Sequence, residues 1–231
     1  MSDFKNRMIK EMKIRGLLDS TVKVYLKSIS QFNKHCCKPL DQVDIQDIKD
    51  YQYYLLKERR RKLSPRSVNR DISGIKFFYR YVLGRYDVQD AIPRVKAAQI
   101  VTPILSVDEI KSMIESVHKV HYKAILMTMY SCGLRRKELQ RLTIQDIDSK
   151  RMLLRVNGKN NKQRYVVLSP MLLKVLRTYW RLFRVNSEIK SDYLFIPSKI
   201  HPHSEAGKYL SHTAISYVLQ TAVKAANIKK K

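Results

Sequence analysis

The spacing of apolar residues, which recurs at three and four positions through long stretches of the chain, is the strongest constraint on its fold. Between residues 20 and 36 it produces one continuous stripe, made of Val22, Tyr25, Leu26, Ile29, Phe32 and Cys36. This period places the apolar side chains on one face of an amphipathic helix. A similar stripe follows Pro65, which fits the first turn of a helix capped by Ser64. The first part of the chain is therefore expected to be helical.

Four helices are predicted in the first 84 residues, over about 3–15, 20–36, 44–62 and 64–82. Asp19 or Ser20 is the expected N-cap of the second helix, and Asp44 opens the third. The third helix is expected to end in the basic run at 57–62, since positive side chains are favourable at a helix C-terminus. Four amphipathic helices bury their stripes together in one small domain.

The helical period is lost over residues 85–105, which contain two prolines. Proline restricts the residue before it to extended conformations, so this segment is predicted to form an extended basic linker. A second domain is expected over 106–231, and it opens with a capping box of Ser106 and Glu109. The chain thus divides into a domain over 1–84, a linker and a second domain.

The middle of the second domain changes character. Residues 152–156 and 165–168 form short, apolar, partly β-branched segments, and a polar stretch at 158–163 separates them. This pattern is typical of a β-hairpin. A further strand is predicted over 193–196, and helices are expected over 124–130, 170–184 and 213–226. The fold class is therefore mainly α with a small β-hairpin or sheet, an α+β arrangement.

The charge of the chain indicates what it binds. Lysine and arginine number 46 against 20 aspartate and glutamate residues, which gives a net charge of +26. An excess of this size is most simply balanced by a polyanion, and nucleic acid is the first candidate. In the first domain the predicted DNA-facing residues lie in one basic run and on the helix after it: Lys57, Arg59, Arg60, Arg61, Lys62, Arg66, Arg70, Lys76 and Arg80. The alternative is an ordinary solvated face.

Membrane and secreted proteins do not fit this sequence. No apolar stretch approaches the ~20 residues that a bilayer crossing requires, and residues 1–15 lack the apolar block of a secretory signal. Cys36, Cys37 and Cys132 are too few for a disulfide framework, which suits a reducing compartment. A cytoplasmic protein with no membrane partner is expected.

Metal and nucleotide cofactors are not expected either. His35, Cys36 and Cys37 are metal ligands by type, but three consecutive helical residues cannot converge on one tetrahedral ion. No zinc-finger spacing occurs, and Gly158 begins no phosphate-cradling G-x-x-x-x-G-K loop. The sequence predicts neither a metal site nor ATP chemistry.

The segment with the most chemical information is 131–139, Ser-Cys-Gly-Leu-Arg-Arg-Lys-Glu-Leu. It places Gly133 at the end of an apolar helix and Arg135 at the start of the next. A rigid core would aim a guanidinium held there, and the group could bind phosphate oxygens bidentately at any relevant pH. The plain alternative is a solvated basic helix start.

Together with a second motif, this segment resembles the tyrosine recombinase family of phage integrases and Xer-type recombinases. The family's first catalytic arginine follows Gly-Leu and precedes Glu-Leu, as Arg135 does, and a Leu-Thr-x-x-Asp-Ile stretch comes next, as at 142–147. The family's catalytic lysine lies in a β-hairpin after glycine, as Lys159 follows Gly158, 24 residues beyond the arginine. The resemblance covers nearly the whole chain.

The resemblance implies a helical core-binding, SAM-like domain joined by a basic linker to a catalytic domain, the two closing around duplex DNA. It also implies strand transfer through a 3′-phosphotyrosine, without metal or nucleotide cofactor. In that scheme Arg135 holds the non-bridging phosphate oxygens, and Lys159 donates a proton to the leaving 5′-oxygen. Lys162 is the alternative acid, and Glu138 orients the arginine region. Lys162 and Arg164 are expected to contact DNA, and the simpler role for Lys159 is the same backbone contact.

The sequence departs from the family after its last predicted helix. The family continues into a His-x-x-Arg motif, a Gly-His motif and the nucleophilic tyrosine, whereas the 231 residues run only to Lys231. No histidine from His201 onward is followed three residues later by arginine, and neither Tyr209 nor Tyr217 follows a Gly-His pair. The expectation is a catalytic domain over 106–231 that is truncated before these motifs and has no nucleophile.

Two hypotheses for the function stay open, with a third from another class. The chain is an inactive fragment of a mobile-element recombinase whose remainder is encoded separately or was lost. Alternatively, it is a DNA-binding module that occupies recombination sites or pairs with itself or an intact recombinase. A basic RNA-associated protein would leave the paired Arg135 and Lys159 motifs unexplained. The expected partner is double-stranded DNA, and the expected process is site-specific recombination or integration.

Overall fold

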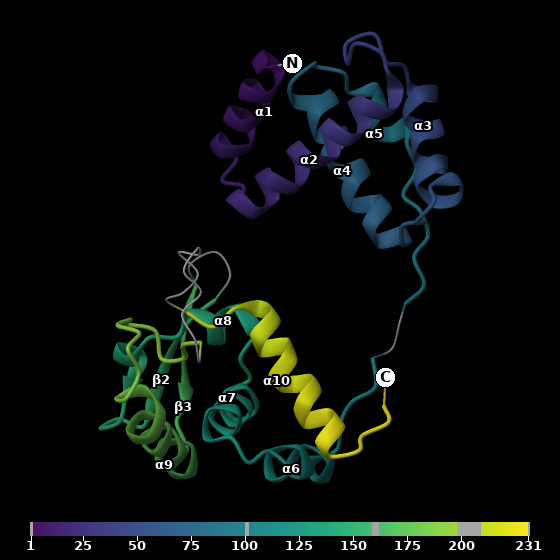
Figure 1. Ribbon diagram of the computed structural model, residues 1–231. Coiled ribbons are helices and arrows are strands. Elements are labelled where there is room, and N and C mark those ends of the chain that lie inside the picture. Colours follow the sequence, from purple (N-terminus) through teal and green to yellow (C-terminus); the bar gives the residue numbers. More distant parts are fainter. Residues whose placement is uncertain (1, 100–101, 159–161, 198–208, 231) are drawn as a thin grey trace. The chain divides into compact units, whose positions relative to one another are not determined.

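The computed structural model describes residues 2–99, 102–158, 162–197 and 209–230 (Figure 1). The chain forms two compact units, Met1–Val101 and Thr102–Lys231. Each unit has its own hydrophobic core, and none of the described buried residues belongs to both cores. The observed elements are mainly helices with one small antiparallel sheet, which confirms the fold class predicted from the sequence.

The first unit contains five helices within the described residues: α1 Ser2–Ile14, α2 Asp19–Cys36, α3 Ile45–Tyr53, α4 Pro65–Tyr81 and α5 Asp87–Ala91. A π-helical turn, η1 Tyr54–Glu58, extends α3. Helices α2 and α4 pack against each other (Figure 1). Gly74 permits this approach, because a Cβ at its position would lie 3.2 Å from the Cα of Tyr25. The predicted stripe of α2 enters the core through Val22, Ile29 and Phe32.

Two of the predicted helix caps in this unit are confirmed and one is wrong. Asp44 and Ser64 each accept a hydrogen bond from the backbone N–H three residues further on, and Asp44 forms a full capping box. The N-cap of α2 is Leu18, not Asp19 or Ser20, and it makes no side-chain cap bond. The reason is that the Leu18 carbonyl already accepts the first hydrogen bonds of the helix.

The segment predicted as an extended linker, 85–105, is partly folded into the first unit. Residues Asp87–Ala91 form α5, and Val88 and Ile92 are buried in the core of this unit. The sequence pattern missed α5 because a helix of five residues is too short to display a 3.6-residue period.

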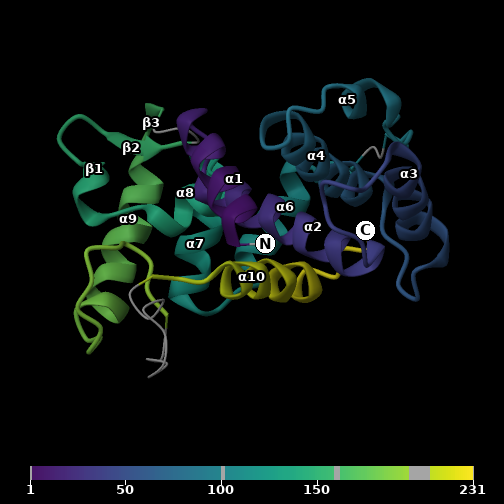
Figure 2. The ribbon, with the colours of Figure 1, turned by 90° about the horizontal axis from the view of Figure 1, so that it is seen from above.

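The second unit has the helices α6 Val107–Glu115, α7 Val120–Ser131, α8 Arg136–Arg141, α9 Pro170–Tyr179 and α10 His212–Ala225, and the short turns η2 Ile144–Asp146 and η4 Trp180–Arg184. Helix α7 lies between α9 and α10 (Figure 1 and Figure 2). Ala124, Ile125 and Leu126 of α7 are buried, which confirms the buried apolar helix predicted over 124–130, although Tyr130 at its end is exposed.

The sheet of this unit has the order β1-β2-β3 and is antiparallel throughout, with β1 Ile147–Asp148, β2 Leu153–Asn157 and β3 Gln163–Val167. Strands β2 and β3 form the predicted hairpin. Strands β1 and β3 are the two outer strands, and the Tyr165 and Val167 side chains of β3 are exposed. Strand β1 was not predicted, because two residues carry no alternation.

The strand predicted over 193–196 is wrong. In the described chain this segment makes one isolated β-bridge, between Tyr193 and Thr143. Leu194, Phe195 and Ile196 are buried consecutively, so the apolar run reflects packing and not sheet pairing. None of the described helices has the length and apolar character needed to cross a membrane.

Candidate functional site

Arg135 stands at the start of α8, after the turn that follows α7. Gly133 ends α7 with a positive φ of 57°, and Leu134 is buried beneath the turn. Arg135 is the N-cap residue of α8, and its side chain is 76% exposed. The core of the second unit therefore presents an accessible guanidinium.

The carboxylate of Glu138 holds this arginine. The Glu138 side chain is buried, and its Oε2 accepts a hydrogen bond from the backbone N–H of Arg135 at 2.9 Å. Its Oε1 accepts another from Arg135 Nη1 at 3.0 Å. A guanidinium carries five N–H donors, so most donors of Arg135 remain available to a ligand.

A second arginine, from the sheet, holds the same carboxylate. Arg164 in β3 donates from Nη1 to Glu138 Oε1 at 3.0 Å and from Nη2 to Oε2 at 2.9 Å. Such a bidentate pair is strong and geometrically specific. The sequence predicted a DNA contact for Arg164, whereas the structure shows its guanidinium committed to Glu138. The two residues are 26 positions apart, and no local pattern signals their contact.

The hairpin loop that carries Lys159 begins beside this cluster. A Cβ on Gly158 would lie 3.6 Å from Glu138 Oε1 and 3.7 Å from Arg164 Nη1. The Gly158 N–H donates a hydrogen bond to the Lys162 carbonyl at 2.8 Å, and Lys162 is exposed. Lys159 itself lies outside the described residues. Gly158, which precedes Lys159, therefore lies close to the Glu138 carboxylate that holds Arg135.

Glu138 is ionised at neutral pH. Hydrogen bonds from Arg164, and then from Arg135, lower the pKa of Glu138 from 4.5 to about 2, although burial opposes the shift. Two guanidiniums around one carboxylate leave a net charge of +1 at this place, and Arg135 is the more exposed of the two. The cluster is therefore suited to attract an anion.

A second buried carboxylate fixes the stretch after α8. Asp146 accepts hydrogen bonds from the Thr143 N–H at 2.8 Å and the Thr143 hydroxyl at 2.7 Å. It also accepts one from Nε of Arg155 in β2 at 2.8 Å. The Leu-Thr-x-x-Asp stretch is thereby tied to the same sheet that carries Arg164.

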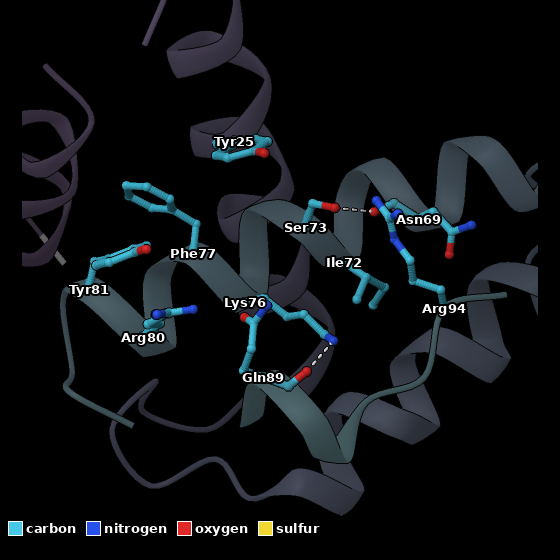
Figure 3. A pocket seen from close by; sticks show the side chains of 10 residues that line it. All are labelled: Tyr25, Asn69, Ile72, Ser73, Lys76, Phe77, Arg80, Tyr81, Gln89 and Arg94. Carbon is cyan, nitrogen blue, oxygen red and sulfur yellow. Dashed lines mark hydrogen bonds between the residues drawn. The ribbon is translucent and has the colours of Figure 1, made fainter. Parts of the chain in front are cut away.

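The first unit has a basic cavity beside α2 and α4 (Figure 3). Its volume is about 460 Å³, and its wall combines three cations with three aromatic rings, from Lys76, Arg80, Arg94, Tyr25, Phe77 and Tyr81. The Arg80 guanidinium lies 5.1 Å from the ring centre of Tyr81 and 5.7 Å from that of Tyr86. Within the described residues Arg80 Nε has no hydrogen-bond partner. Lys76 instead donates hydrogen bonds to the backbone carbonyls of Gln89 and Ile92, and thus holds α5 in place (Figure 3).

The other predicted DNA-facing side chains lie at the surface of the first unit. Most are exposed, namely Lys57, Arg60, Arg61, Lys62, Arg66 and Arg70, and Arg59 is half-buried. Arg70 also donates two hydrogen bonds to Oδ1 of the buried Asp71, which accepts a third from the Ser28 hydroxyl. Arg94, which also lines the cavity, was not predicted to face DNA, and its only signal in the sequence is a basic residue directly after Pro93.

The cysteine and histidine side chains of α2 are explained by packing. The His35 ring stacks on Tyr54 with a centre-to-centre distance of 4.2 Å. Burial raises the pKa of the Cys36 thiol to about 11. In the described ranges no group of three histidine, cysteine, aspartate or glutamate side chains could hold a metal ion.

Both units match described protein families. Residues 103–231 match the phage integrase family, and residues 4–87 match the N-terminal SAM-like domain of phage integrases. Together the two matches span most of the chain.

Individual proteins match over nearly the whole chain. Identity is 36% over 232 residues to the putative integrase/recombinase y4qK of Sinorhizobium fredii, a match that covers 100% of this chain and 70% of that protein. Identity is 26% over 237 residues to the tyrosine recombinase XerC of Pediococcus pentosaceus, with 94% and 75% covered. Among solved structures, a lambda integrase tetramer bound to a Holliday junction shares the fold, with a TM-score of 0.71 at 15% identity over 99% of this chain and 66% of that one.

Proposed function

Since the chain belongs to the phage integrase family, we propose that it binds duplex DNA in site-specific recombination and brings Arg135 and Lys159 to the phosphate. The observation that carries this proposal is the exposed Arg135 guanidinium, which Glu138 holds beside the start of the hairpin loop. The proposal requires no metal and no nucleotide cofactor. It places the chain on DNA in the cytoplasm.

Arg135 and Lys159 have different chemical roles in this proposal. The free N–H donors of Arg135 bind the non-bridging oxygens and stabilise the negative charge that develops during phosphoryl transfer. Lys159 donates a proton to the leaving 5′-oxygen, and Lys162 is the alternative acid. Neither group forms the covalent bond, which needs a nucleophilic tyrosine in the scheme implied by the family.

The proposed DNA grip uses basic residues of both units, and in the second unit these are Arg135, Lys159 and Lys162. In the first unit they are the run at 57–62, which is exposed apart from the half-buried Arg59, then Arg66 and Arg70 on α4, and the cavity lined by Arg80 and Arg94. Each lysine or arginine that contacts a phosphate releases a counterion, so affinity falls as salt rises. Strong salt dependence is therefore the expected signature of binding.

Removing the positive charges of Arg60, Arg61 and Lys62 is expected to weaken binding to duplex DNA. The triple change to glutamine removes up to three phosphate contacts, which lowers the slope of affinity against salt by up to about three and the affinity at least about tenfold. Gel shifts at several salt concentrations measure both values.

A matched control for this triple variant removes three exposed lysines outside the proposed surface, Lys190, Lys224 and Lys229. Their change to glutamine alters the net charge equally and is expected to leave the affinity nearly unchanged. Equal weakening by both triples would show that total charge, and not the 57–62 run, sets the affinity.

Residues 1–231 are expected to form no covalent adduct with a nicked suicide duplex, because none of their tyrosines follows a Gly-His motif. The measurement is a denaturing gel after incubation of the protein with labelled DNA. Tyr130 on α7 and Tyr217 on α10 are exposed on helices that contact α8, so each is also changed to phenylalanine. An adduct that one of these changes abolishes would identify a nucleophile within these residues.

A non-catalytic DNA-binding role is the second candidate. It is favoured by the separate hydrophobic core of each unit and by the basic cavity of the first. Such a chain would occupy recombination sites, or pair with itself or with an intact recombinase. A salt-sensitive gel shift without an adduct favours this role, and adding the chain to an active relative distinguishes inhibition of that enzyme from cooperation with it.

A further inference from the structure

We propose that Arg164 is a positioning residue, which occupies Glu138 and so keeps the Arg135 guanidinium available to phosphate. This inference rests on the proposed function and deepens it. It explains how a buried carboxylate holds Arg135 without neutralising it. Arg164 itself does not contact DNA in this proposal.

The hydrogen bonds of Glu138 carry the inference. A carboxylate has about four acceptor sites. Four bonds of 2.9 to 3.0 Å reach Glu138, two from Arg135 and two from Arg164. Arg164 takes one site on each oxygen. The Arg135 side chain therefore makes one bond to Glu138 and stays 76% exposed, compared with 38% for Arg164.

Loss of Arg164 would change how the hydrogen bonds to Glu138 are shared. One acceptor site on each Glu138 oxygen would be left empty in a buried position, and Arg135 is the cation already in contact. An unpaired buried charge is costly, so the Arg135 guanidinium is expected to turn and form the bidentate contact itself. Arg135 would then lie against Glu138 with its charge neutralised.

Arg164 also lies close to Gly158 of the second motif. Its Nη1 lies 3.7 Å from the position of a Cβ on Gly158, and that Cβ would be 3.1 Å from the Lys162 carbonyl oxygen. The guanidinium thus lies beside Gly158, the last described residue before Lys159. The Arg164 side chain is therefore close both to Gly158 and to the carboxylate that holds Arg135.

The direct test is the reactivity of single arginines toward phenylglyoxal, read by mass spectrometry after the full chain is labelled and digested. In Arg164→Met, Arg135 is expected to react several-fold more slowly than in the wild type. Arg151, whose side chain is 81% exposed, is the internal reference. An unchanged or faster reaction of Arg135 would overturn the inference. No DNA is present, so this result is independent of the proposed function.

Two further variants separate positioning from charge. Arg164→Lys keeps the charge but cannot make the bidentate contact, so it is also expected to slow the reaction of Arg135 with phenylglyoxal. If Arg164→Met does not fold, the comparison is made with Arg164→Lys. Arg155→Met removes a similar arginine from another buried carboxylate, Asp146. Arg155→Met is expected to leave the rate at which Arg135 reacts with phenylglyoxal unchanged. If it slowed this reaction as much as Arg164→Met does, the inference would also be overturned.

DNA binding gives an independent measure through a double-mutant cycle. In an otherwise wild-type chain, Arg164→Met is expected to weaken the affinity for DNA about tenfold. In a chain that already carries Arg135→Met, it is expected to weaken this affinity hardly at all. Additive losses would assign Arg164 to direct DNA contact and contradict the positioning role. Absence of DNA binding by the wild type would contradict the proposed function, while the phenylglyoxal result would still decide the role of Arg164.

Discussion

Glu138→Ala is expected to lower the free energy of unfolding of the second unit by about 2–3 kcal/mol, because it removes the shared acceptor of charge-assisted hydrogen bonds from two arginines. The change removes the acceptor of four hydrogen bonds and leaves the Arg135 and Arg164 guanidiniums facing each other. The single tryptophan of the chain, Trp180, lies in this unit, so its fluorescence during urea unfolding measures the loss. Glu115→Ala, at an exposed position in α6, is the control and is expected to cost less than about 0.5 kcal/mol.

Acid unfolding provides a second signature of the same carboxylate. Because the folded-state pKa of Glu138 is about 2 and its ordinary value is 4.5, its contribution to stability is complete above pH 4.5 and is lost as the pH falls toward 2. The shift corresponds to a contribution on the order of 3 kcal/mol. Trp180 fluorescence is expected to show a steeper loss of stability in the wild type than in Glu138→Ala over this range. Equal slopes would contradict a buried, doubly paired carboxylate.

In the first unit, Phe32→Ala is expected to cost about 3–5 kcal/mol of unfolding free energy. The Phe32 side chain is fully buried, and its ring centre lies 5.0 Å from that of Tyr51 and 6.4 Å from that of Tyr79. In urea unfolding of this variant, part of the helical circular dichroism signal should be lost at a lower urea concentration than in the wild type. The midpoint of the Trp180 fluorescence change, which reports on the second unit, should stay the same.

The control for this change is Tyr53→Ala, which removes an exposed ring from α3 and is expected to cost less than about 0.5 kcal/mol. A parallel shift of both signals in Phe32→Ala would mean that the two units unfold together and not independently.

The helices were predictable because their signals are local. The stripe predicted after Pro65 consists of Val68, Ile72, Ile75, Tyr79 and Val82, and along α4 and its C-cap all five side chains are buried. The caps at Asp44, Ser64 and Ser106 need only the three residues that follow each of them. A residue pattern of this kind contains both the period and the start of a helix, so no knowledge of distant contacts was needed.

The features that the sequence did not reveal depend on contacts between distant residues. Charge alone favours solvent or DNA for any arginine, so it could not show that Arg164 pairs with Glu138. Lys76 was predicted to face DNA for the same reason, but it binds carbonyl groups at the end of α5. The sequence located Arg135 and the hairpin glycine by their motifs, and the structure adds the carboxylate that joins them.

Strand β3 pairs on one side only within the described chain, and it presents Tyr165 and Val167 to solvent. An open strand edge is a template on which another chain can add a strand, which is a route to aggregation. The one charged side chain of this strand, Arg164, is turned toward Glu138. Two copies of this chain repel each other through their net charge of +26, and this repulsion extends about 10 Å at 0.1 M salt but only about 3 Å at 1 M. The high salt that should weaken the proposed DNA binding is therefore also expected to favour self-assembly through this edge.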